Sequence, residues 1–283
     1  MMMVRSRKYL NAAVYHLICM ILVVIMIYPV LWMIMSSFKT QSGIFRGNLS
    51  LIPDEWRFAN YVEGWQGFGN NTFGIFFSNS FIIAITATLG TMTSAALVSY
   101  GFARIRFPGA KFLFGCMIGT LMLPYQIIMI PQYLILHRLG WVNTFLPMIV
   151  PWSLGNPFFI FLMIQFVRTI PFELDESALI DGCTKFGIFY RIILPLCKPA
   201  LVTVAIFSFY WRWQDFIQPV IYLSKPRLYT VSVALRLFAD PTSVTNWGAM
   251  FAMASLSILP VMTVFFILQK YIVEGISTTG LKG

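Results

Sequence analysis

Long apolar segments separated by short polar ones make up most of this chain. Stretches without Asp, Glu, Lys or Arg occupy 9–38, 64–103, 112–137, 139–167 and 241–269, and a helix needs roughly 20 apolar residues to span a bilayer. A further apolar stretch, near 199–223, is interrupted only by Arg212 and Asp215. The pattern predicts an all-α integral membrane protein with a single transmembrane domain over 1–283. Its six spans are expected at about 12–37, 76–100, 112–131, 144–167, 199–223 and 247–270.

The composition also indicates a membrane protein rather than a soluble one. Hydrophobic residues make up 58% of the chain and charged residues only 11%, a balance that a water-soluble domain does not have. The first apolar stretch is too long for a secretory signal peptide and lacks a cleavage site, so we expect it to remain as a span. His16 and His137 are isolated, and no clustered ligand spacing predicts a metal site.

The basic residues predict an orientation, because they gather on the cytoplasmic side of membrane proteins. With the N-terminus inside, most of the 20 Lys and Arg residues fall in cytoplasmic segments. These are Arg5, Arg7, Lys8, Arg104, Arg106, Lys111, Arg168, Lys185, Arg191, Lys198, Lys270 and Lys282. We therefore expect both termini and the loop at 168–198 to be cytoplasmic. The net charge of +10 follows mainly from this topology, so no nucleic-acid partner is expected.

The loop at 168–198 carries a polar, helix-forming insert between apolar segments. Gly182 is expected to end a first short helix, Thr184 to cap a second one, and Pro195 to stop it. Four apolar residues at helical spacing predict one apolar face on the second helix: Phe186, Phe189, Tyr190 and Ile193. Such a helix, with nothing of its own to pack on, suits the groove of a partner. The alternative is a loop lying on lipid, which its acidic residues would disfavour on an anionic leaflet.

Seven residues of this insert resemble a known family motif. The pattern E-A-A-x3-G-x9-I-x-L-P matches Glu176, Ser177, Ala178, Gly182, Ile192, Leu194 and Pro195 at every spacing. Only Ser177 departs from it, where the family usually has alanine. The insert thus resembles the EAA loop of ABC importer permeases. The resemblance implies that these seven residues couple the chain to an ATP-hydrolysing subunit.

Other stretches are similar to the carbohydrate-uptake branch of these permeases, in particular to the smaller permease subunit of maltose-type importers. They are Tyr28-Pro29 with 36–39, the inner turn at 100–109, Leu123-Pro124 with Ile130-Pro131, and the tail at 269–283. The resemblance implies a type I ABC importer permease fold in a bacterial or archaeal plasma membrane. It also implies the partners: an ATP-binding cassette ATPase dimer that binds ATP and Mg²⁺, a second non-identical permease, an extracytoplasmic solute-binding protein and a carbohydrate.

Two charges fall within the predicted fifth span. Arg212 lies about 20 Å along a helix from Pro199, at 1.5 Å per residue, and a charge near the bilayer centre costs at least about 2.5–3.5 kcal/mol. Arg212 and Asp215 should therefore face a cavity or pair with each other to lock helix packing. The aromatic and polar side chains around them suit a sugar, so the candidate substrate pathway is Tyr210, Trp211, Arg212, Trp213, Gln214 and Asp215. Residues 213–216 also resemble the family's Trp-Asn-acidic-Phe signature, and the additional Arg212 suggests an anionic sugar.

The leading hypothesis is a permease subunit of an ATP-driven carbohydrate importer that forms half of the translocation pathway. The chain has no G-x-x-x-x-G-K-[ST] phosphate loop, so we expect it to be no enzyme and to hold no cofactor itself. The alternative is an ion-coupled secondary transporter, but only Asp215 could serve a buried ion relay. A membrane enzyme would need a motif such as H-E-x-x-H or G-x-S-x-G, and neither occurs.

Overall fold

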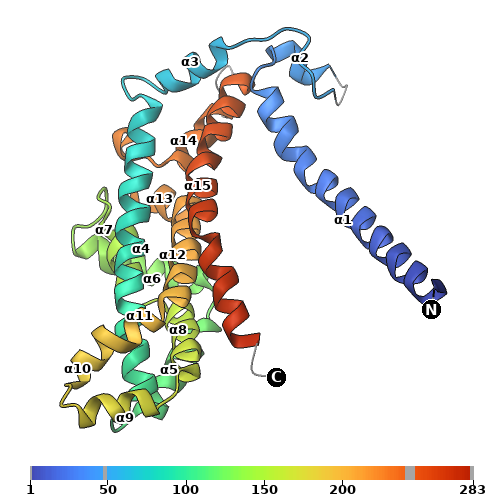
Figure 1. Ribbon diagram of the computed structural model, residues 1–283. Helices are drawn as coiled ribbons and strands as arrows, with labels where there is room; N and C mark the ends of the chain where they lie inside the picture. The colour runs from blue at the N-terminus through green and yellow to red at the C-terminus, as the bar shows by residue number, and fades with distance from the viewer. Residues whose placement is uncertain (1, 47–49, 240–245, 281–283) are drawn as a thin grey trace. The chain divides into compact units, whose positions relative to one another are not determined.

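The computed structural model describes residues 2–46, 50–239 and 246–280 (Figure 1). The contacts divide the chain into two compact units, Met1–Phe73 with Leu235–Ser257 and Gly74–Ala234 with Ile258–Gly283. Within the described residues the fold is all-helical, as predicted, and the one β-bridge, between Phe68 and Asn71, is isolated.

Four helical segments are long and apolar enough to cross a membrane. Three are single helices, α1 (Met2–Ser36), α4 (Phe73–Arg104) and α15 (Trp247–Gly280). The fourth combines α7 (Leu146–Ser153) and α8 (Pro157–Thr169). Two further pairs are sharply bent: α5 (Ala110–Leu121) with α6 (Tyr125–Arg138) by 104°, and Lys185–Leu196 with α12 (Lys198–Trp213) by 73°. The described residues thus allow four to six crossings, and six spans remains a prediction.

Three expected spans contain a helix break in the structure. The fourth span, expected at 144–167, is interrupted between Ser153 and Pro157. The third expected span is interrupted between Leu121 and Tyr125, because Pro124 disfavours helical backbone at the residue before it and supplies no N–H. The fifth is interrupted between α12 and the short α13 (Ile217–Tyr222). At that break Asp215 Oδ1 accepts the backbone N–H of Gln218 at 3.3 Å, as a helix-capping side chain does.

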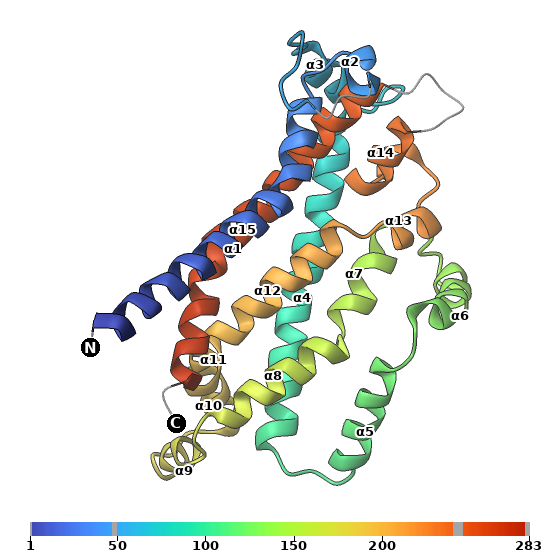
Figure 2. The same cartoon turned by 90° about the vertical axis from the view of Figure 1, so that its right-hand side faces the viewer.

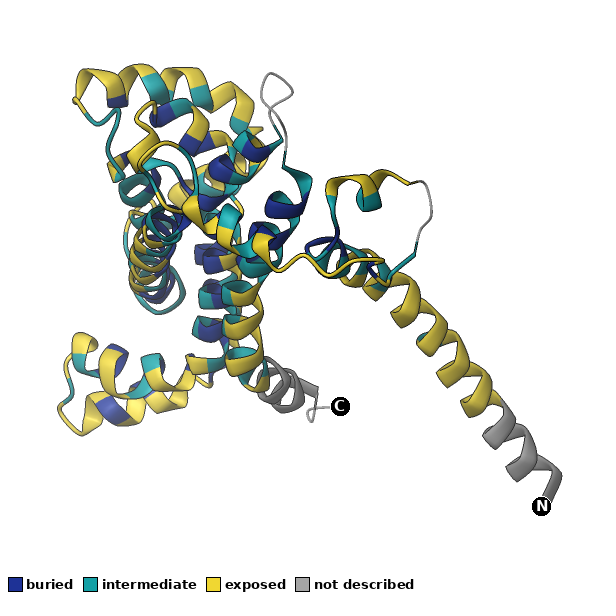
Figure 3. Ribbon diagram, turned by 90° about the horizontal axis from the view of Figure 1, so that it is seen from above, coloured by how far each residue is buried: buried dark blue, intermediate teal, exposed yellow. Residues whose placement is uncertain are grey.

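The first unit holds α1, α2 (Gln41–Phe45), α3 (Ala59–Gln66) and the beginning of α15. Asn60 joins α3 to the end of α1, since its Nδ2 donates to Ser37 O at 2.8 Å and Lys39 O at 2.9 Å. The apolar residues of α1 between 14 and 31 are largely exposed, and Figure 3 shows the yellow colour of exposed residues along this helix. A helix this apolar needs lipid or another protein chain as its surroundings.

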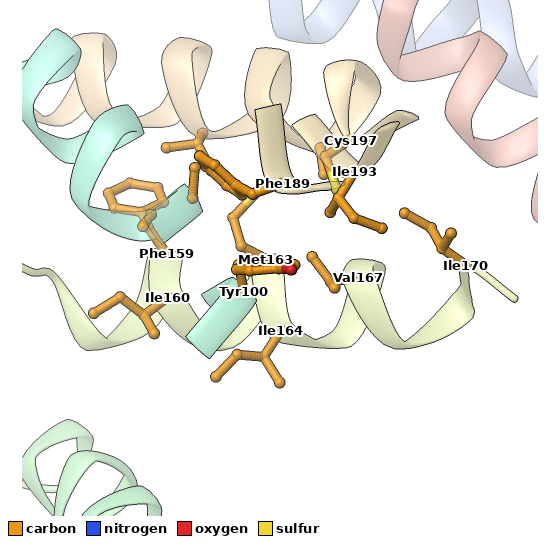
Figure 4. Close-up of a cluster of buried hydrophobic side chains, with 14 of the residues drawn as sticks. Tyr100, Phe159, Ile160, Met163, Ile164, Val167, Ile170, Phe189, Ile193 and Cys197 are labelled. Carbon is orange, nitrogen blue, oxygen red and sulfur yellow. The ribbon is translucent and has the colours of Figure 1, made fainter. Parts of the chain in front are cut away.

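In the second unit α4 runs beside α8 and α12, and α9 (Glu173–Ile180) and α10 (Lys185–Ile188) lie at the end where α4 finishes (Figure 2). The apolar core there joins α4, α8, α12 and the loop, and several of its residues are labelled in Figure 4. Tyr100 comes from α4, Met163 and Val167 come from α8, and Phe189 and Ile193 come from the loop. The unit is completed by η2 (Pro226–Leu228) and the first residues of α14 (Val231–Phe238).

The loop at 168–198 forms the two short helices that the sequence predicted. Gly182 has φ +80° and ends α9, because its N–H donates to Leu179 O and the next N–H, of Cys183, donates to Ala178 O. Thr184 caps α10, and its Oγ1 accepts the N–H of Gly187 at 3.1 Å.

The expected end of the second helix at Pro195 is confirmed to within one residue, because the helical segment ends at Leu196 and the chain then bends by 73° into α12. Before that end it passes through a π-helical turn, η1 (Phe189–Ile193), and α11 (Leu194–Leu196). The N–H of Leu194 donates to Phe189 O, five residues back, so the hydrogen-bond ladder is already shifted where Pro195 lacks a donor.

Candidate functional site

A cavity of about 520 Å³ lies in the second unit where three helix breaks meet. The breaks separate α5 from α6, α7 from α8, and α12 from α13. The cavity is lined by Thr120, Leu121, Leu123, Tyr125, Ile128, Gln132, Pro147, Pro151, Trp152, Gly155, Asn156, Pro157, Phe158, Trp211 and Gln218. Its volume falls within the roughly 300–1,000 Å³ typical of small-molecule sites. Irregular backbone inside a membrane protein is tolerated where it lines such a cavity.

Aromatic rings form one wall of this cavity. Trp211 lies with its ring centroid 6.2 Å from that of Trp152 and 5.2 Å from that of Phe158. Trp152 is fixed from behind, because its Nε1 donates to Ser208 Oγ at 3.1 Å and its carbonyl accepts from Thr91 Oγ1 at 3.1 Å. The wall therefore combines flat apolar faces with a rigid placement.

Polar side chains complete the lining, and none of the described lining residues carries a charge. They are Thr120, Tyr125, Gln132, Asn156 and Gln218. Hydroxyl and amide groups beside aromatic faces can bind a polyhydroxylated molecule, since each hydroxyl needs a hydrogen-bond partner and each C–H face an apolar surface.

Arg212 and Asp215 pair with each other behind this wall. Arg212 Nη2 lies 3.2 Å from Asp215 Oδ2, and the two side chains are only 7% and 13% exposed. Arg212 Nη1 also donates to Gln218 Oε1 at 2.8 Å, and the guanidinium lies 3.9 Å from the ring centroid of Trp152. Protein groups thus engage both terminal nitrogens of Arg212, while its buried Nε has no hydrogen-bond partner among the described residues. The pair positions Gln218 and Trp152, which do line the cavity.

The other predicted pathway residues face in several directions. Trp211 is the one member of the six that lines the cavity. Tyr210 borders a separate apolar pocket between α12 and α15, and Trp213 is buried with its ring 4.8 Å from that of Phe81. Gln214 is exposed at the helix break. A continuous helix was expected here, and the break after Trp213 redirects the residues that follow.

Sequence reasoning missed the residues that α5–α8 contribute to the cavity. Trp152 lies within Pro151-Trp152-Ser153-Leu154-Gly155-Asn156-Pro157, a segment with two prolines and a glycine. That composition indicates a helix break, and an aromatic residue at a break in a predicted span is a signal that could have found this wall.

The loop presents a second surface with two different sides. Ala178, Phe189 and Ile193 are buried against the bundle, whereas Ile180, Phe186 and Tyr190 are 87%, 69% and 63% exposed. The expected single apolar face is therefore wrong, because two of its members pack inward and two point away. The motif residues divide in the same way. Glu176, Ser177, Gly182 and Pro195 are exposed, Ile192 and Leu194 are half-buried, and Ala178 is buried.

A helical membrane transport protein is the class that these features define: apolar helices of bilayer length, a cavity at helix breaks, and an anchored loop with exposed apolar side chains. The chain belongs to the family described as the inner membrane component of binding-protein-dependent transport systems, whose model matches residues 93–278. The resemblance first found in the loop is thereby confirmed at the level of the family. A multi-pass protein of the inner membrane agrees with the apolar helices.

Several relatives match nearly the whole chain. It is 37% identical over 257 residues to the probable ABC transporter permease protein YurM of Bacillus subtilis, which covers 90% of this chain and 84% of the relative. It is 31% identical to the diacetylchitobiose uptake system permease protein NgcG of Streptomyces coelicolor, over 94% of this chain and 87% of the relative. It is 30% identical to the arabinooligosaccharides transport system permease protein AraQ of Halalkalibacterium halodurans, over 92% of each.

A solved structure shares the fold. It is a chain of a bacterial ABC transporter involved in the import of the acidic polysaccharide alginate, with a TM-score of 0.82. The match covers 93% of this chain and 96% of that chain at 20% identity.

Proposed function

We propose that this chain is a permease subunit of an ATP-driven importer of oligosaccharides, coupled through its loop at 168–198 to a separate ATPase. The observation that carries the proposal is the two-sided loop. It is anchored by Phe189 and Ile193 and offers Ile180, Phe186 and Tyr190 outward. Exposed apolar side chains occur at protein-binding and membrane-binding surfaces, and the seven residues of this loop that resemble the ATPase-coupling motif favour a protein partner.

The substrate class follows from the cavity and from the relatives. Diacetylchitobiose and arabinooligosaccharides are named for two of the relatives, and the aromatic and amide lining of the cavity suits such sugars. The anionic sugar that Arg212 suggested is not supported by the geometry, because Arg212 is paired with Asp215 and the described lining is uncharged. We therefore propose neutral sugar residues as the ligands of this cavity. The same pairing disfavours the ion-coupled alternative, which needs Asp215 free to exchange a cation or proton.

The partners belong to the same proposal. The exposed apolar surface of α1 supports a second permease subunit or lipid beside it. A solute-binding protein outside and two ATPase subunits inside, which bind ATP and Mg²⁺, would complete the importer. This orientation requires six spans and cytoplasmic termini. ATP binding would move the loop, and the two states of the bundle would differ in affinity for ATP and for the loaded binding protein.

The turn at Gly182, between α9 and α10, provides a test of the proposed coupling role of the loop. Gly182→Pro cannot adopt φ +80°, because proline fixes φ near −65°, and it removes the N–H that caps α9. In the complete transporter in proteoliposomes, we expect uptake of diacetylchitobiose or arabinotriose to be lost while the chain still inserts.

Ser177→Ala is the matched control in the same loop. The Ser177 hydroxyl donates only within its own helix, to Glu173 O at 2.8 Å, so uptake should be unchanged. Undiminished uptake by Gly182→Pro would refute the coupling role of the loop.

A further inference from the structure

The last turn of α4 is joined to the loop by a buried ion pair. Arg104, the last residue of α4, places Nε 3.3 Å from Asp175 Oδ2 of α9, and both side chains are only 6% exposed. Arg104 Nη2 also donates to Ile170 O at 2.7 Å, and the guanidinium lies 5.3 Å from the ring centroid of Phe172. One guanidinium therefore holds the start of the loop and its first helix together.

The second loop helix is attached to the same turn of α4. Tyr100 lies one turn before Arg104, and its hydroxyl donates to Lys185 O, at the first residue of α10, at 2.9 Å. Its ring centroid lies 5.1 Å from that of Phe189 (Figure 4). If α9 and α10 moved without the end of α4, these contacts would be strained. We therefore expect both loop helices to move together with the end of α4.

α4 extends from this joint to the cavity without a break. Thr91 lies about 20 Å along the helix from Arg104 at 1.5 Å per residue. Its hydroxyl shares one proton between Ala87 O in the same helix at 2.8 Å and Trp152 O at 3.1 Å. Gly90 beside it packs so tightly on Ser153 that a Cβ there would collide with the serine side chain. A displacement of the last turn of α4 can therefore reach the aromatic wall through one rigid element.

The contact between α4 and α9 depends on both Arg104 and Asp175, because their charges are buried and compensate each other. Burial raises the pKa of the Asp175 carboxyl, and Arg104 opposes that rise. Asp175 Oδ1 has no hydrogen-bond partner among the described residues. Arg104 is thus the one neighbour shown to compensate the buried charge of Asp175, and removing either residue strands the other.

We propose that Arg104 and Asp175 are positioning residues for coupling: their ion pair transmits displacement of the loop to α4 and through it to the cavity wall. Neither residue belongs to the seven motif positions that face the ATPase in the proposed function, on which this inference rests. The pair acts inside the permease, between the loop and the bundle.

The test measures ATP hydrolysed per sugar taken up by the complete transporter, purified with its ATPase, second permease and binding protein and reconstituted with diacetylchitobiose or arabinotriose as the probe. Asp175→Asn keeps the shape of the side chain but not its charge. We expect this variant to assemble and to hydrolyse ATP, with a ratio of ATP to sugar about tenfold above wild type, within the roughly 5–150-fold range of coupling between sites. A merely structural role would lower uptake and hydrolysis together and leave the ratio unchanged, which would overturn the proposal.

Two neighbours serve as matched controls. Glu173 lies in α9 and Arg106 lies beyond the end of α4, and both are exposed. Glu173→Gln and Arg106→Gln should keep the wild-type ratio, and a tenfold rise in either would refute a specific role for the buried pair. The charge exchange Arg104→Asp with Asp175→Arg should lower the ratio below that of Asp175→Asn, and no recovery would count against a direct pairing.

Assembly separates this inference from the function on which it rests. If wild-type chain does not co-purify with an ATPase, the proposed function fails before any variant is compared. If Asp175→Asn does not assemble, Arg104→Gln decides, because it removes the cation of the pair but keeps a side-chain N–H donor that can serve Ile170 O. A wild-type ratio of ATP to sugar in Arg104→Gln would then overturn the inference.

Discussion

Replacing Arg212 with glutamine distinguishes a structural role of this buried cation from a role in binding an acidic sugar. The guanidinium pairs with Asp215 at 3.2 Å, donates to Gln218 at 2.8 Å and covers Trp152 at 3.9 Å. None of these partners is a substrate, and Arg212 itself does not line the cavity. Arg212→Gln should therefore destabilise the bundle without changing which sugars are preferred.

The magnitude follows from what the substitution leaves behind. Removing one partner of a buried ion pair costs about 3–5 kcal/mol, because the remaining charge is stranded. The lost contact with Trp152 accounts for up to about 2 kcal/mol of such a change, and the charged hydrogen bond to Gln218 for about 1.5–3 kcal/mol. These contributions overlap. The double variant Arg212→Gln with Asp215→Asn strands no charge, so it should recover on the order of 2 kcal/mol relative to Arg212→Gln.

Thermal unfolding in detergent and uptake in proteoliposomes measure the two roles. We expect the Tm of Arg212→Gln to fall by roughly 10 °C, at about 2–4 °C per kcal/mol, and the double variant to regain part of it. Uptake of a neutral oligosaccharide and of an alginate pentasaccharide should change in the same proportion, within about threefold or 0.7 kcal/mol. A selective loss of acidic uptake with an unchanged Tm would show that Arg212 contacts a substrate carboxylate and would refute the reasoning.

Two further substitutions test the cavity and its connection to α4. Trp211→Ala should lower uptake of neutral sugars about tenfold or more, equivalent to about 1.4 kcal/mol, without loss of ATPase binding. Phe112→Ala, an exposed aromatic residue of α5 that does not line the cavity, should leave uptake unchanged. Gly90→Leu should cost about 1–3 kcal/mol through overpacking against Ser153, measured as a lower Tm. Gly101→Leu in the same helix meets no atom within 4 Å of the added Cβ and should have little effect.

Local backbone chemistry explains which parts of the structure were predictable. Gly182 and Thr184 end one helix and begin the next through hydrogen bonds to residues a few positions away, so their types and spacing were sufficient. The pairing of Arg212 with Asp215 was one of two alternatives, because both the cost of a buried charge and the short spacing were visible in the sequence. The end of the second helix beside Pro195 was predictable from the same local backbone chemistry, whereas the π-helical turn at Phe189–Ile193 leaves no signal in residue type.

Contacts between segments that are far apart in the sequence could not be predicted from local backbone chemistry. Arg104 and Asp175 lie in separate elements, and no local pattern indicates that they meet. The cavity could not be predicted either, because the residues that line it lie near three separate helix breaks and come together only in the folded bundle. Prolines in predicted spans were visible, but a proline can kink a helix or end it, and packing around Trp152 and Pro124 decides which occurs.

Broken helices and the unbroken α4 are expected to respond differently to a displacement. A helix interrupted at 122–124, 154–156 or 214–216 can change its angle at the break, because few hydrogen bonds resist rotation there. α4 has no such point between Thr91 and Arg104, so it transmits a displacement rather than absorbing it. In the proposed importer the cavity would have to change shape when the loop moves, and helix breaks around the cavity together with an unbroken α4 would allow this. A substitution that bends α4 between these residues should therefore uncouple transport even though it touches neither the loop nor the cavity.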